Sequence, residues 1–214
     1  MSGILDLLNS DLGKTIVSGV AGQTGQDESK TGNLLTMALP VLMQAMKNNA
    51  ATPQGADGLL SALNKKHDGS ILDNLGGLFG GGVDSNVMDD GSKILGHVLG
   101  SRQQNVENAL SKKSGINAGS VGQILKVAAP ILMGVLGKQS KQQNTNNSSG
   151  IESLLGGLLK GNSPQQEQSF LESILDADGD GSIIDDVAGM VLGGGSKKKS
   201  GLGGLLGGLF GGKK

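Results

Sequence analysis

The chain has 214 residues and a formal net charge of −1, and 39 of its residues are glycine. It contains no Cys, which excludes a disulfide framework and thiol chemistry. With no Trp or Tyr and only three Phe, it offers no aromatic platform for nucleic acid, so nucleic-acid binding is not expected. The apolar patterns are helical throughout, which predicts an all-α protein with a core of Leu, Ile, Val, Met and Ala.

The first part of the chain predicts one long apolar helix among short ones. Residues 31–48 are apolar almost all round, so this helix should be central and buried. Pro40 inside it predicts a kink or a break into two pieces. Shorter helices are expected on either side of it, at 3–9, 11–21, 56–64 and 70–79. Asp11 is the expected N-cap of the second of these.

The second part of the chain repeats this pattern of short and long helices, interrupted by a polar segment. Residues 138–150, KQSKQQNTNNSSG, predict a low-complexity linker. Helices are expected before and after it, at 89–100, 102–112, 119–137, 151–160, 164–175 and 184–192.

An internal repeat explains why the helical pattern occurs twice. LLTMALPVLM at 34–43 aligns with ILKVAAPILM at 124–133, at a constant offset of 90 residues. DGSI at 68–71 recurs at 180–183, at an offset of 112 because of the insertion after Gly137. The chain is therefore expected to be a duplicated multi-helix unit. The predicted segments are a first repeat at 1–85, the start of a second repeat at 86–137, the linker at 138–150, helices with an Asp-rich loop at 151–192, and a Gly/Leu/Lys-rich tail at 193–214.

The Asp-rich loop is DADGDGSIIDD, residues 176–186. Three aspartates at alternate positions followed by glycine form the front half of an EF-hand-like calcium loop, because Ca²⁺ prefers six to eight oxygen ligands. Val187 stands where the loop normally ends in a bidentate Glu, so the carboxylate one position earlier is the available substitute. The predicted ligands of a Ca²⁺ ion are Asp176, Asp178, Asp180, Ser182 through its backbone carbonyl, and Asp186.

A metal-free interpretation of the same loop also stands. An Asp-Gly turn could cap the helix that begins near residue 184. In the first copy Asn64, Lys66 and Asp68 occupy the positions of the three alternating aspartates, and a lysine in the middle excludes a divalent ion. Only the second copy is therefore expected to bind calcium, while the first shows that the turn also has a use without metal.

The tail at 196–214 places Leu and Phe among glycines at three- and four-residue spacing, with lysines at both ends. This pattern is typical of a cationic segment at a membrane surface. A flexible Gly-rich tail is the alternative, because glycine disfavours helix formation. In a third interpretation, its lysines pair with the acidic segment when calcium is absent.

No catalytic constellation is visible. His67 and His97 lack a metal-ligand spacing and are expected to be structural or on the surface. There is no nucleophile elbow, cysteine nucleophile or phosphate-binding loop, so the chain is not expected to be an enzyme. Without a secretory signal or an 18-residue apolar run, the default expectation is a cytoplasmic location and no ordinary membrane-spanning helix.

The block LLxxAxPxLM, with the glycine before it, resembles the bacterial YidB-like proteins, a family classed as a domain of unknown function. The matching positions are 32–43 and, more fully, 114–136. The resemblance covers about half the chain, outside the linker and the tail. It implies an all-helical fold and a bacterial source, and it supplies no catalytic residue or substrate.

Together these observations predict a non-catalytic helical protein, stabilised by calcium, that serves as a structural or interaction module. Its partner would be another protein or a second copy of itself. The alternative is a membrane-surface or self-assembling protein that acts through residues 196–214.

Overall fold

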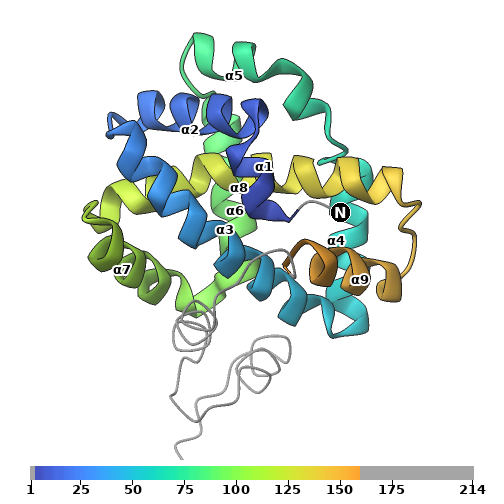
Figure 1. Cartoon of the computed structure of the whole chain (residues 1–214). Helices are drawn as coiled ribbons and strands as arrows, with labels where there is room; N and C mark the ends of the chain where they lie inside the picture. The colour runs from blue at the N-terminus through green and yellow to red at the C-terminus, as the bar shows by residue number, and fades with distance from the viewer. Residues whose placement is uncertain (1–2, 160–214) are drawn as a thin grey trace, which may run out of the picture.

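The computed structural model describes residues 3–159, and over this range the chain is helical, without strands (Figure 1). The all-α prediction is therefore confirmed. In chain order the helices are α1 (Ile4–Asn9), α2 (Asp11–Thr24), α3 (Glu28–Ala50), α4 (Pro53–Lys65), α5 (Leu75–Gly80), α6 (Ser85–Leu99), α7 (Gln103–Ser114), α8 (Ala118–Gln142) and α9 (Ser148–Leu159), with 3₁₀ turns η1 (Ser70–Asn74) and η2 (Gly100–Arg102).

The duplication is visible in the two connections that lead into the long helices. Gly25 ends α2 and Gly115 ends α7, both in the left-handed conformation, with φ of 62° and 69°. Glycine takes this conformation without a steric penalty. Two residues later in each copy, a side chain caps the next helix: Asp27 accepts from the Lys30 N–H at 2.9 Å, and Asn117 accepts from the Ser120 N–H at 2.8 Å. The two copies thus repeat the same helix–turn–helix device.

The cores of the two copies are built from the same positions. Many apolar side chains separated by 90 residues are buried in both copies, so these positions of the repeat contribute to the core twice. Examples are Ile4 and Ile94, Ile16 and Val106, Val20 and Leu110, Leu34 and Ile124, Leu35 and Leu125, Leu42 and Leu132, and Met43 and Met133. Each such burial contributes roughly 1.5–3 kcal/mol.

The two copies interlock. The long helices α3 and α8 pack against each other, α2 contacts both of them, and α7 does the same from the second copy. In Figure 1, α8 runs through the middle of the molecule with α3 crossing it. The last helix of each copy also packs on the long helix of the other copy, since α4 contacts α8 and α9 contacts α3. The copies therefore form one hydrophobic core, and neither closes its core alone.

Pro40 does not divide the long helix of the first copy. Helix α3 continues from Glu28 to Ala50 with Pro40 buried inside it, and Pro130 lies inside α8 in the same way. The predicted alternative of two separate pieces is wrong for this reason: the apolar residues on both sides of Pro40 are anchored in the common core. Their burial outweighs the one backbone hydrogen bond that proline cannot make.

Several boundaries differ from their predicted positions, and the single helix predicted at 70–79 is a 3₁₀ turn, η1, followed by α5. The N-cap of α2 is Ser10 instead of Asp11, since the Ser10 hydroxyl oxygen accepts from the Gly13 N–H at 3.2 Å. Helix α8 runs through Gln142, so the first five residues of the predicted linker are helical, and α9 begins at Ser148. Ser140 is buried there and its hydroxyl donates to the carbonyl of Thr145 at 3.3 Å, which ties the end of α8 to the loop that follows.

Among the described helices, α8 is the one whose length and composition match a membrane span, with a mean hydropathy of 1.5. In the fold, 78% of its apolar window is buried by other helices. Its central place in the shared core accounts for its composition.

Candidate functional site

The predicted calcium ligands Asp176, Asp178, Asp180, Ser182 and Asp186 lie outside the described residues, as does the 193–214 tail. Within residues 3–159, no three His, Asp or Glu side chains gather closely enough to hold a metal ion. The first copy, however, contains the counterpart of the Asp-rich loop at residues 64–75, and this segment is described in full.

The first-copy segment forms a tight turn between α4 and η1. Oδ1 of Asp68 accepts from the Ser70 N–H at 3.1 Å, which closes the turn on its own backbone. Gly69 has a φ of 102°, a conformation open to glycine and strained for other residues. In the first copy the DGSI sequence therefore forms a turn, as the metal-free interpretation predicts for this copy.

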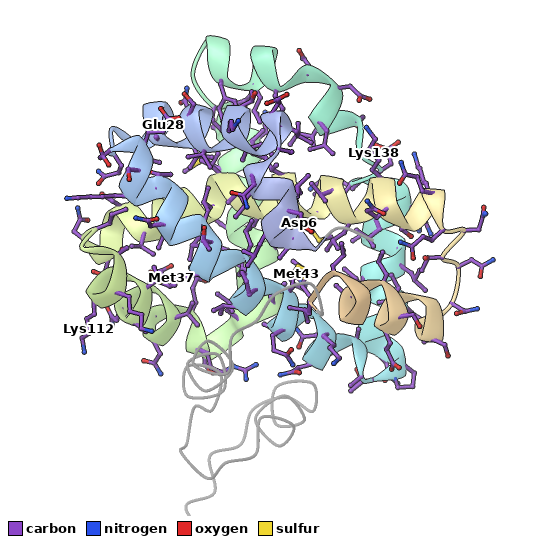
Figure 2. The ribbon with its side chains drawn as sticks, viewed as in Figure 1. Asp6, Glu28, Met37, Met43, Lys112 and Lys138 are labelled. Atoms are coloured by element: carbon purple, nitrogen blue, oxygen red, sulfur yellow. The ribbon has the colours of Figure 1, made fainter. Side chains whose placement is uncertain are left out.

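The turn rests on a glycine-lined face of α8. A Cβ on Gly137 would meet the carbonyl oxygen of His67, and a Cβ on Gly134 would meet the side chain of Ile71. A Cβ on Gly69 would lie 3.0 Å from the Cβ of Lys138. Figure 2 shows Lys138 on the side of α8 where the chain passes between α4 and α5. The first copy's turn is thus fixed on the second copy's long helix.

Two lysines form ion pairs at this turn. Nζ of Lys141 donates to Oδ2 of Asp68 at 2.8 Å, and Lys66 pairs with Asp90 on α6. The hydrogen bond from Lys141, followed by those from Ser70, holds the pKa of Asp68 well below its ordinary value. Lys141 therefore neutralises a carboxylate of the turn itself, and Lys66 of the turn neutralises a carboxylate of α6.

His67 belongs to the same cluster and is buried, with 7% of its surface exposed. Its Nε2 lies 3.6 Å from Oδ2 of Asp90. Burial lowers the pKa of His67, opposed by Asp90 and assisted by Lys66. The imidazole is therefore neutral at pH 7, in a structural role. Its pairing with Asp90 could not be predicted from the sequence, because the two residues are 23 positions apart and belong to no common motif.

A polar cleft of about 430 Å³ opens beside this cluster, between the turn and α6. Its lining includes Lys66, His67, Ser70, Asp89, Asp90 and Lys93. The Asp90 carboxylate faces both the Lys66 ammonium and the His67 ring, so these three groups are engaged with one another. This arrangement ties α4 to α6, as a structural cross-link does.

A second, mostly apolar groove of about 840 Å³ lies between α4 and α6. Its lining includes Met46 of α3 and Met133 of α8, together with Leu59 and Ile94. Small residues, among them Gly55, Gly58 and Gly96, keep it open. Such a groove suits an apolar side chain of another molecule.

Comparison with known proteins supports the repeat-based interpretation. The model of the family described as bacterial protein of unknown function (DUF937) matches residues 6–139 and, in a second segment, residues 140–214. The match includes the 138–150 segment and the tail, which the sequence resemblance left outside the family. No curated protein and no solved structure matches the chain. Matched along almost its whole length, the chain belongs to the DUF937 family, as its LLxxAxPxLM block suggests.

Proposed function

We propose that this protein is a non-catalytic structural or interaction module in which residues 176–186 bind one Ca²⁺ ion. The ligands would be Asp176, Asp178, Asp180, the backbone carbonyl of Ser182, and Asp186. Binding would screen the carboxylates and couple the ion to the stability of the second copy.

The observation that carries this proposal is that two lysines form ion pairs at the first-copy turn, Lys141 with Asp68 and Lys66 with Asp90 on α6. Lys66 and Lys141 provide its two ammonium groups. In the repeat alignment Lys66 is replaced by Asp178, and counting 90 residues back from Lys141 in the last turn of α8 gives Ala51, the C-cap of α3. The second copy therefore lacks both cations at the equivalent positions, while it keeps the turn sequence and adds carboxylates.

The charge distribution along the second copy supports the same proposal. Between Glu167 and Asp186 there are seven acidic residues, and no Lys or Arg occurs from 161 to 196. Carboxylates a few ångströms apart repel one another unless a cation or solvent separates them. A divalent ion is the simplest substitute for the two missing ammonium groups.

Isothermal titration calorimetry of Ca²⁺ into the full chain, first stripped of metal by chelation, tests the proposal. We expect a single saturable site that is lost in Asp176→Ala and in Asp180→Ala. Asp57→Ala, which removes an exposed carboxylate from α4, is the matched control and should bind as the unaltered chain does. The absence of saturable binding at millimolar Ca²⁺ would refute the proposal.

The interaction half of the proposal is supported by the apolar groove between α4 and α6. The alternative function places the active part in the tail, where five lysines and no acid follow Gly193. Co-sedimentation with vesicles that contain anionic lipid separates the two functions. A membrane-surface protein would lose binding when truncated after residue 195, and equal sedimentation of both chains would reject the membrane function.

A further inference from the structure

Helix α5 is seated on α2 through a notch at a glycine. A Cβ on Gly19 would overlap the ring of Phe79, so the absence of a side chain at this position makes room for the ring. Gln23, one turn further along α2, donates from Nε2 to the carbonyl of Phe79 at 3.1 Å and accepts at Oε1 from the Val83 N–H at 2.9 Å. The sequence LGGLFG thus covers one face of α2, and Figure 1 shows α5 beside α2 at the edge of the molecule.

Helix α7 is the second-copy counterpart of α2, and among residues 3–159 it has no such cover. The main neighbours of α2 are α1, α3, α8 and α5. Helix α7 makes the corresponding contacts with α6, α8 and α3. In the described part of the chain, no helix packs on α7 as α5 packs on α2. The repeat therefore leaves one expected neighbour of α7 unaccounted for.

The sequence supplies a segment for this place. At the offset of 112 that joins the two DGSI motifs, LGGLFG at 75–80 aligns with VAGMVL at 187–192. Leu75, which is buried, corresponds to Val187, and Phe79 corresponds to Val191. Apolar positions are kept in both, as a segment that covers a helix requires.

The sizes of the contacting residues change in a compensating way. Gly19 on α2 corresponds to Ala109 on α7, which adds a methyl group where the notch would be. The residue that would enter it changes from Phe79 to Val191, which is smaller. A full ring would overpack against the added methyl group, whereas a smaller side chain such as valine would leave room for it.

We propose that residues 187–192 dock on α7 around Ala109, as α5 docks on α2 around Gly19. The chain length permits it, since 27 residues separate Leu159 from Val187 and can span up to about 90 Å, against a radius of gyration of about 15 Å for a domain of this size. The inference goes beyond the proposed function and does not depend on calcium.

Disulfide trapping in the full chain tests the docking, because the chain contains no cysteine of its own. In the variant Ala109→Cys with Val191→Cys, we expect an intramolecular disulfide under mild oxidation, seen as a faster band on a non-reducing gel. The pair Gly19→Cys with Phe79→Cys gives the reference rate of disulfide formation, because these two positions are in contact in the first copy. The pair Lys112→Cys with Val191→Cys is the matched control, since Lys112 is exposed on α7 (Figure 2).

Docking predicts trapping at Ala109 roughly tenfold or more faster than at Lys112, because a seated segment has a high effective concentration at its seat. Equal rates would overturn the proposal. Faster trapping of Ala109→Cys with Phe210→Cys would place the tail's own LGGLFGG sequence on α7, and disulfide-linked dimers would place a second copy there; either result would also overturn it. Each oxidation is run with Ca²⁺ and with chelator, so that loss of calcium binding is recorded separately from loss of docking.

Discussion

The ammonium of Lys141, in the last turn of α8, lies 2.8 Å from Oδ2 of Asp68, in the turn after α4. This ion pair joins the second copy's long helix to the first copy's DGSI turn. It also defines the difference between the copies, because the second copy repeats the turn sequence without the lysine that serves it.

Asp68→Asn is expected to remove an acid-sensitive part of the stability. The pKa of Asp68 is lowered from 3.8 in the folded chain, so its contribution is complete above about pH 4 and is lost as the pH falls further. The variant should therefore melt at a lower temperature than the unaltered chain at pH 6, and the two melting temperatures should begin to converge as the pH falls below 4. Lys141→Met removes the main cause of the shift and should show the same convergence. Melting curves that stay parallel from pH 6 to pH 2 would contradict this prediction.

His67 gives a second pH dependence, at higher pH. Burial lowers its pKa below 6.5, so the folded chain binds fewer protons than the unfolded chain. Its contribution is present above pH 6.5 and declines as the pH falls below that value. Because Asp90 opposes the shift, Asp90→Asn should move the pKa of His67 further down. Imidazole resonances followed by NMR, assigned with His97→Gln, measure this shift, and an upward movement would be inconsistent with the effect of Asp90 on His67.

Substitutions at two glycines of α2 should act in opposite directions. Gly19→Ala places a methyl group against the ring of Phe79 and is expected to destabilise the chain by about 1–3 kcal/mol. Gly22→Ala, three residues later in the same helix, meets no atom within 4 Å and should be neutral or stabilising by up to about 1 kcal/mol. Urea unfolding of the two variants measures the difference. Equal effects would mean that α5 is not seated on α2.

The equivalent caps of the two long helices should contribute equally. Asp27→Ala and Asn117→Ala each remove a side-chain acceptor from a helix N-terminus and are expected to cost about 1 kcal/mol. Urea unfolding of both single variants and of the double variant checks this. A cost confined to one copy would show that the two connections are not energetically equivalent.

Much of the fold could be predicted from the repeat. The 90-residue offset identified the paired prolines and the common core positions because each is a local apolar pattern, and the left-handed glycines stand at the same spacing. The interlocking of the copies could not be predicted, since helical periodicity says which face is buried and not which helix covers it. The N-cap was misplaced by one residue because Ser10 and Asp11 are both good caps. The pairing of His67 with Asp90 depends on how α4 and α6 meet in three dimensions, which no local pattern encodes.

The central claim is that calcium takes the place of the two lysines in the second copy. It is tested most directly by Asp178→Lys, which gives the second-copy loop the lysine found at this position in the first copy. The melting temperature of the full chain and of Asp178→Lys is measured in chelator and in millimolar Ca²⁺. We expect calcium to raise the melting temperature of the unaltered chain, by an amount equivalent to about 2.7 kcal/mol when the ion is at 100 times its Kd, and to leave that of Asp178→Lys unchanged. An unaltered chain that melts at the same temperature with and without calcium, or an Asp178→Lys chain that still responds, would contradict the account.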